Sequence, residues 1–100
     1  MKKFYLLRHE DLHGHAGLGV VAEGVVFDDG MAAMTWLTEI VTVTNFREVG
    51  DIVKLHGHEG RTEIVIEGQR GKQQLFVECQ IEARKRKDEM IAKRKRGKKK

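Results

Sequence analysis

The segment from residue 19 to residue 37 most constrains the fold, because two apolar stretches flank a turn signal. Residues 19–27 (GVVAEGVVF) are rich in valine, which favours β-strands. The Asp-Asp-Gly at 28–30 is typical of a tight turn, since glycine can adopt positive φ. Residues 31–37 are apolar at both alternating sets of positions. We therefore predict a β-hairpin whose second strand is covered on both faces, with Gly24 marking a bulge or a bend in the first.

Three other segments have strand patterns. Residues 3–8 are aromatic and aliphatic, whereas 40–44 (IVTVT) and 62–67 (TEIVIE) alternate between β-branched and other side chains. Polar, glycine-bearing segments follow the first and the last of these strands, at 9–17 and 68–71, as expected of loops and turns. Together with the hairpin, these patterns predict five strands.

A short helix is predicted after the strand at 40–44. Asn45 and Glu48 fit a capping box, in which each side chain bonds a backbone N–H of the other residue. The apolar residues that share one face of such a helix are Phe46, Val49, Ile52 and Val53. Gly57 is a natural stop. We therefore predict a helix over about 46–55.

The pattern of residues 73–83 fits two structures. Leu75, Val77, Cys79 and Ile81 lie two apart, as in a sixth strand, whereas Leu75, Phe76, Cys79 and Ala83 fit one face of a helix. Residues 82–96 are rich in helix formers and are predicted to be helical in either case. We expect the last three lysines, 98–100, to be disordered.

These elements predict an α+β protein with a small, bent, antiparallel sheet of five to six strands, either open or closed like a barrel. One short helix and a basic C-terminal helix complete it. One hundred residues allow a single domain. Net charge differs sharply between two parts of the chain: residues 1–83 have a net charge of −5, whereas residues 84–100 have a net charge of +9. We therefore predict a compact acidic α+β domain over 1–83 and a basic helical or disordered tail over 84–100.

The basic tail suggests contact with nucleic acid. Its predicted phosphate-binding residues are Arg84, Lys85, Arg86, Lys87, Lys93, Arg94, Lys95, Arg96, Lys98, Lys99 and Lys100. Such a segment binds phosphates through counterion release and does not read base sequence. No aromatic residue interleaves with them, so stacking on single strands is not predicted. Two alternatives stay open: the tail is solvated and keeps the protein soluble, or it folds back on the acidic body.

The peptide Leu-His-Gly-His-x-Gly occurs twice, at 12–17 and at 55–60. It allows two interpretations. The imidazoles of His13, His15, His56 and His58 are suitable zinc ligands if the two loops meet. Alternatively, each copy is a turn signal at a strand boundary, where glycine supplies backbone freedom. No Cys-x-x-Cys or His-Glu-x-x-His motif supports the metal site, so no cofactor is predicted.

No enzymatic constellation is recognisable in the sequence. The single cysteine, Cys79, lacks a nucleophile signature and excludes an internal disulfide, which fits a reducing cytoplasm. The glycines lie in predicted turns and form no phosphate-cradling motif. No segment is long and apolar enough to span a bilayer, and the tail has too few bulky apolar anchors for a membrane surface.

Three motifs, VAEGVVFDDG at 21–30, WLTE at 36–39 and HGHEGRTEIV at 56–65, occur in a recurring order. In this respect residues 4–66 resemble a family of short proteins of actinobacteriophages and their actinobacterial hosts, for which no activity is established. The pattern includes the second His-Gly-His-x-Gly and not the first, which argues against a four-histidine site. The resemblance implies a phage-type accessory protein that works in the cytoplasm of a bacterial host cell, and it implies no catalytic residues.

We therefore predict a non-enzymatic binding module whose basic tail contacts nucleic acid nonspecifically. The alternative is a modulator that binds a host protein through the acidic body. A further alternative is a metal-binding protein that uses the two His-Gly-His loops. The sequence specifies no oligomeric state.

Overall fold

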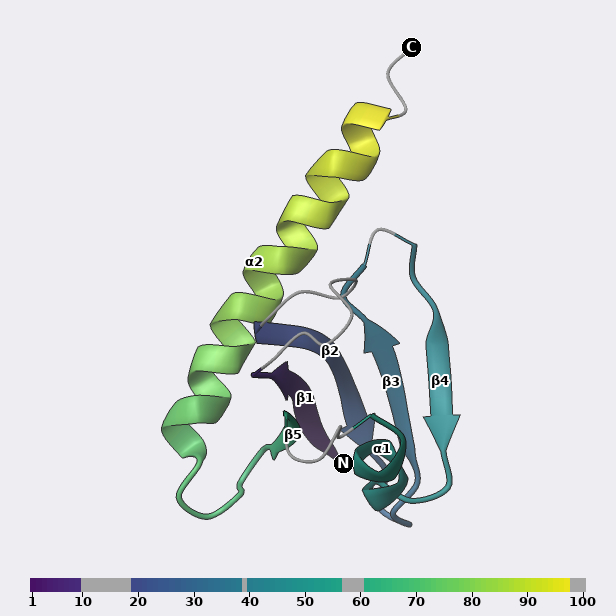
Figure 1. The fold of residues 1–100 in the computed structure, drawn as a ribbon, viewed down its shortest axis with the longest axis vertical. Coiled ribbons are helices and arrows are strands. Elements are labelled where there is room, and N and C mark those ends of the chain that lie inside the picture. Colours follow the sequence, from purple (N-terminus) through teal and green to yellow (C-terminus); the bar gives the residue numbers. More distant parts are fainter. Residues whose placement is uncertain (10–18, 39, 57–60, 98–100) are drawn as a thin grey trace.

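The computed structural model describes residues 1–9, 19–38, 40–56 and 61–97, which form a three-layer α+β fold (Figure 1). The strands are β1 (Lys2–Arg8), β2 (Gly19–Val26), β3 (Ala32–Trp36), β4 (Val43–Phe46) and β5 (Thr62–Ile66), and the helices are α1 (Gly50–His56) and α2 (Gln73–Gly97). All strand pairs are antiparallel, in the order β4-β3-β2-β1-β5. The sheet is open, with β4 and β5 at its edges, so the α+β prediction is confirmed and the barrel alternative is wrong.

The two helices cover opposite faces of the sheet. Successive side chains of a strand point to opposite faces, so neighbouring residues of β1 pack against different helices. On β1, Phe4 and Leu6 join the core cluster that includes Ile52 of α1, whereas Tyr5 joins the cluster that includes Phe76 of α2. Phe4, Leu6 and Ile52 have no exposed surface. The sheet is therefore the shared middle layer, and α2 supplies three of the seven buried residues of the core cluster on its side.

The predicted hairpin forms between β2 and β3. The Phe27 N–H donates to the Met31 carbonyl (2.8 Å), and Gly30 lies in the turn with φ +93°. The irregularity expected at Gly24 lies elsewhere: the register of β2 against β1 shifts between Leu6 and Leu7. Gly24 itself is paired regularly. The close approach of the Phe4 ring explains why a glycine occupies this position. A Cβ atom there would lie 2.5 Å from Cζ of Phe4.

The predicted helix start at residue 46 is wrong. Phe46 ends β4, opposite Ala32 in β3, and is only 8% exposed, whereas the helix begins at Gly50. Pairing with β3 buries the Phe46 ring, and this tertiary gain outweighs the local capping signal at Asn45. The strand predicted at 40–44 accordingly lies at 43–46, and Ile40 and Val41 remain exposed.

Residues 73–83 are the first half of α2, so the sixth-strand alternative is wrong. Phe76, Cys79 and Ala83 are buried at helical spacing, whereas Val77 and Ile81 are 46% and 64% exposed. At the start of α2, the N–H of Phe76 donates a hydrogen bond to the carbonyl oxygen of Lys72, the residue before the helix (2.8 Å). The 25 residues of α2 extend for roughly 37 Å. None of the described helices is long and apolar enough to cross a membrane.

Candidate nucleic-acid interface and neighbouring polar sites

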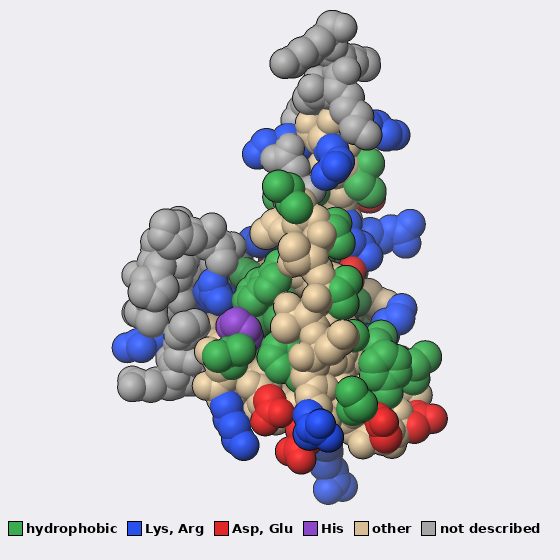
Figure 2. Space-filling model, turned by 90° about the vertical axis from the view of Figure 1, so that its right-hand side faces the viewer, with side chains coloured by type: hydrophobic (Ala, Val, Ile, Leu, Met, Phe, Trp, Pro, Cys, Tyr) green, Lys and Arg blue, Asp and Glu red, His purple; other side chains and the backbone are tan. Residues whose placement is uncertain are grey.

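The second half of α2, residues 84–97, projects past the sheet (Figure 1). We call this segment the α2 arm. Ala83 is the most C-terminal residue of the core, and after it the buried helical stripe ends. Figure 2 shows Lys and Arg side chains around the projecting part of the helix. The arm therefore combines a fixed base in the core with an exposed cationic end.

The structure places most of the predicted phosphate-binding residues on the arm. Arg84, Lys85, Lys87, Lys93, Arg94 and Lys95 are exposed, and Arg86 is half-buried. The side chain of Arg96 and all of Lys98, Lys99 and Lys100 lie outside the described residues. Because α2 is a regular helix, these cations point in several directions around its axis. The arm presents positive charge on more than one side.

Two of these cations contact carboxylates of the chain itself. Lys87 forms an ion pair with Glu23 on β2 (2.8 Å), and Arg86 pairs with Glu82 one turn earlier (3.6 Å). The Lys87–Glu23 pair is a contact of the kind that the fold-back alternative predicts. Exposed ion pairs contribute little, about 0.5 kcal/mol each, so they leave the cations able to exchange partners.

Glu82 joins the base of the arm to the sheet. One oxygen of its carboxylate accepts the N–H of Val20 at the start of β2 (2.7 Å). Gly19 lies directly beside this carboxylate with φ +85°, a conformation that suits glycine. The contact fixes where α2 leaves the sheet and where the arm begins.

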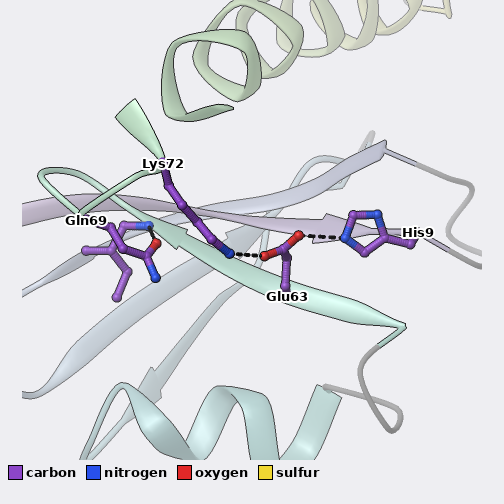
Figure 3. Close-up of polar contacts among 5 residues, drawn as sticks. His9, Glu63, Gln69 and Lys72 are labelled. Carbon is purple, nitrogen blue, oxygen red and sulfur yellow. Dashed lines mark hydrogen bonds and ion pairs between the residues drawn. The ribbon is translucent and has the colours of Figure 1, made fainter. Parts of the chain in front are cut away.

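A second polar cluster lies at the β5 edge, where Glu63 is held from two sides (Figure 3). The ammonium of Lys72 donates to one carboxylate oxygen (2.5 Å), and Nε2 of His9 lies 2.7 Å from the other. The hydrogen bond from Lys72 is the main cause that lowers the pKa of Glu63, with the contact to His9 as a smaller one; partial burial opposes both. No local pattern could predict this cluster, because its members come from three separate segments of the chain.

Replacing Glu63 with glutamine is expected to lower the free energy of unfolding by about 1 kcal/mol at pH 7. Because the folded pKa lies below the ordinary value of 4.5, the stabilisation is complete above pH 4.5 and is lost as pH falls through the lower folded value. Urea unfolding of both proteins at pH 7 and near pH 3 measures this. The difference should shrink at acid pH, whereas Glu78→Gln, an exposed control, should change stability at neither. A difference independent of pH would contradict the assignment.

The predicted metal ligands fall only partly within the described residues. Among the predicted ligands, His56 is described: its ring meets the ring of Trp36 edge to face at a centroid distance of 5.0 Å, and Phe46 is close by at 6.3 Å. His13, His15 and His58 lie outside the described residues. In the described ranges, no group of three or more metal-ligating side chains comes together. The four-histidine site remains a prediction.

Cys79 is a packing residue on the buried face of α2. Its side chain is 2% exposed, and burial, with help from the carboxylates of Glu82 and Glu63, raises the pKa of the thiol to about 11. A thiol of this kind is protonated at neutral pH and is a poor nucleophile. This position makes Cys79 a small apolar packing residue of the core.

The fold and the exposed basic helix define a small α+β protein with a cationic arm, and sequence comparison places it among phage proteins. The model of the Acb5 phage protein family matches residues 1–68, and the chain belongs to this family. The match covers the whole sheet and α1 and ends before α2 begins. Neither the curated proteins nor the solved structures include a significant match. The resemblance to phage proteins is thereby confirmed at the level of the family.

Proposed function

We propose that this phage protein is a non-enzymatic accessory protein whose α2 arm binds nucleic acid through its phosphates, without reading sequence. The carrying observation is the position of the cations. Arg84, Lys85, Lys93 and Lys95 are exposed, and within the described ranges no carboxylate pairs with them. Lys93 and Lys95 lie near the C-terminal end of α2, which projects past the sheet (Figure 1), so their charge is presented away from the acidic body.

Counterion release is the physical basis of the proposal. Each phosphate that a Lys or Arg neutralises frees condensed cations, which lowers the affinity as salt rises. The described arm of 14 residues extends for roughly 21 Å, a length along which duplex DNA carries on the order of ten phosphates. Residues 84–97 include no aromatic side chain, so base stacking does not contribute. Duplex and single-stranded nucleic acid are therefore both ligands, and the backbone is what they share.

The test is fluorescence anisotropy of a labelled random-sequence duplex with the full chain, over 50 to 300 mM salt. The variant Lys85→Gln/Lys93→Gln/Lys95→Gln removes three exposed charges of the arm. We expect it to weaken binding at least tenfold at the lowest salt and to flatten the salt slope by up to about three. Scrambling the duplex sequence should leave the affinity unchanged.

A matched variant separates the arm from overall charge. Lys2→Gln/Lys3→Gln/Lys54→Gln removes three lysines from β1 and α1 and lowers the net charge equally. If both triple variants lose the same affinity, binding follows net charge and the arm has no special part. If neither variant nor the parent chain binds at 50 mM salt, the proposed function is wrong.

A further inference from the structure

Three charged side chains form a row on the α2 arm, on the part of its surface that does not face the sheet. Lys85, Glu89 and Lys93 follow one another at intervals of four residues, and side chains at this spacing are neighbours on a helix. All three are exposed, and none of them lines the two grooves between α2 and the sheet. Because each residue turns a helix by about 100°, Lys85 and Glu89 point away from Ala83, the last residue of the buried stripe. The row is therefore open to solvent.

Charge alternates along this row. Lys85 and Lys93 are eight residues apart, which is about 12 Å along the helix axis. Glu89 lies midway, about 6 Å along the axis from each of them. Among the described residues, no ion pair removes any of these three charges. The row therefore consists of two cations with a carboxylate between them, and it is not a continuous cationic ribbon.

The spacing of the two lysines suits one arrangement of phosphates better than others. Every nucleotide of a strand carries a phosphate, so a strand that runs along α2 sets at least one phosphate opposite the Glu89 carboxylate, which repels it. Across the major groove of B-form DNA, which is about 12 Å wide, the two backbones face each other with no phosphate between them. A helix that crosses this groove places one lysine on each backbone and Glu89 over the gap. The minor groove, about 6 Å wide, would draw both lysines in towards Glu89.

We propose that the arm prefers duplex DNA to single strands, because the row of Lys85, Glu89 and Lys93 bridges the major groove. This preference rests on the proposed function of the arm, and it adds the form of the nucleic acid and the geometry of the contact. Single strands still bind through the cations of the arm, with lower affinity. Glu89 sets the preference, since it opposes a strand that lies along the helix and meets no phosphate of a duplex that the helix crosses.

Fluorescence anisotropy of the full chain with a labelled duplex and with a labelled single strand of the same length, at 100 mM salt, tests the role of Glu89. A duplex has the higher charge density and binds any cation better, so the diagnostic quantity is the change in preference on substitution. In Glu89→Gln, the affinity for the single strand should rise at least fivefold and that for the duplex less than twofold. Glu78→Gln is the matched control, because Glu78 is exposed on α2 and lies outside the interval between the two lysines. It should change both affinities by the same factor.

Dimethyl sulfate footprinting of the duplex at saturating protein tests which groove is crossed. The reagent methylates guanine N7 in the major groove and adenine N3 in the minor groove. We expect methylation of N7 to fall at least threefold and methylation of N3 to stay unchanged. Guanine N7 that stays reactive, or equal gains of both affinities in Glu89→Gln, would overturn the groove contact and leave phosphate binding in place. A parent chain that binds neither nucleic acid would overturn the groove contact together with the proposed function.

Discussion

Replacing Phe76 with alanine is expected to lower the free energy of unfolding by about 3 kcal/mol. Phe76 is 8% exposed in the first turns of α2, and its ring lies 5.2 Å from that of Tyr5, centroid to centroid, at a tilt of 54°. Truncation removes the aromatic contact and leaves a cavity between α2 and the sheet, both of which are costly. Urea unfolding followed by circular dichroism measures the loss.

The neighbouring residue supplies the control for this prediction. Val77 is 46% exposed on the outer side of α2, so Val77→Ala should change stability by less than about 0.5 kcal/mol. If Phe76→Ala costs no more than Val77→Ala, the base of α2 is not part of the core. The proposed arm would then have no fixed attachment to the sheet.

Replacing Gly24 with alanine is expected to cost about 2–3 kcal/mol. The added Cβ would lie 2.5 Å from the Phe4 ring and would also press on the backbone carbonyl of Ala33. Phe4 has no exposed surface and nowhere to move, and the Ala33 carbonyl belongs to the neighbouring strand of the sheet. Relief of this overlap therefore requires β2 and β3 to separate. Thermal unfolding monitored by calorimetry gives the change.

The same substitution at Gly50 separates this steric cost from the general effect of glycine. Gly50 is the first residue of α1, and a Cβ there would meet no atom within 4 Å. Gly50→Ala should therefore be neutral or stabilise by up to about 1 kcal/mol, because it restricts the unfolded chain. A Gly24→Ala protein as stable as Gly50→Ala would show that Phe4 does not pack across Gly24.

Sequence patterns predicted the elements whose local and tertiary preferences agree. The β2–β3 hairpin follows from valine-rich strands around the Asp-Asp-Gly turn, and β1 and β5 follow from their apolar and alternating residues. The start of α1 was mispredicted because Asn45 and Glu48 supply a capping signal, whereas the gain from burying Phe46 against β3 is invisible in a local window. The structure of residues 73–83 stayed open because a strand period and a helix period are each fitted by four apolar residues.

The polar contacts of the site could not be predicted from the sequence. Glu63 meets His9, which is 54 residues away, and Glu82 meets Val20, which is 62 residues away. Neither distance leaves a pattern in one chain, because the contacts arise only when β1 pairs with β5 and α2 packs on β2. The charge of the arm could be predicted from composition alone. Its direction could not, because that depends on the buried residues Phe76, Cys79 and Ala83.

We propose that α2 packs on the sheet with its first half and binds phosphates with its second. Amide chemical shifts of the isotope-labelled chain, followed during titration with a random-sequence duplex at 50 mM salt, test it residue by residue. We expect shift changes over 84–97 that reverse at 300 mM salt, with little change in β1, β5 and residues 73–79. Changes centred on α1 or the β5 edge, or no change at all, would contradict it.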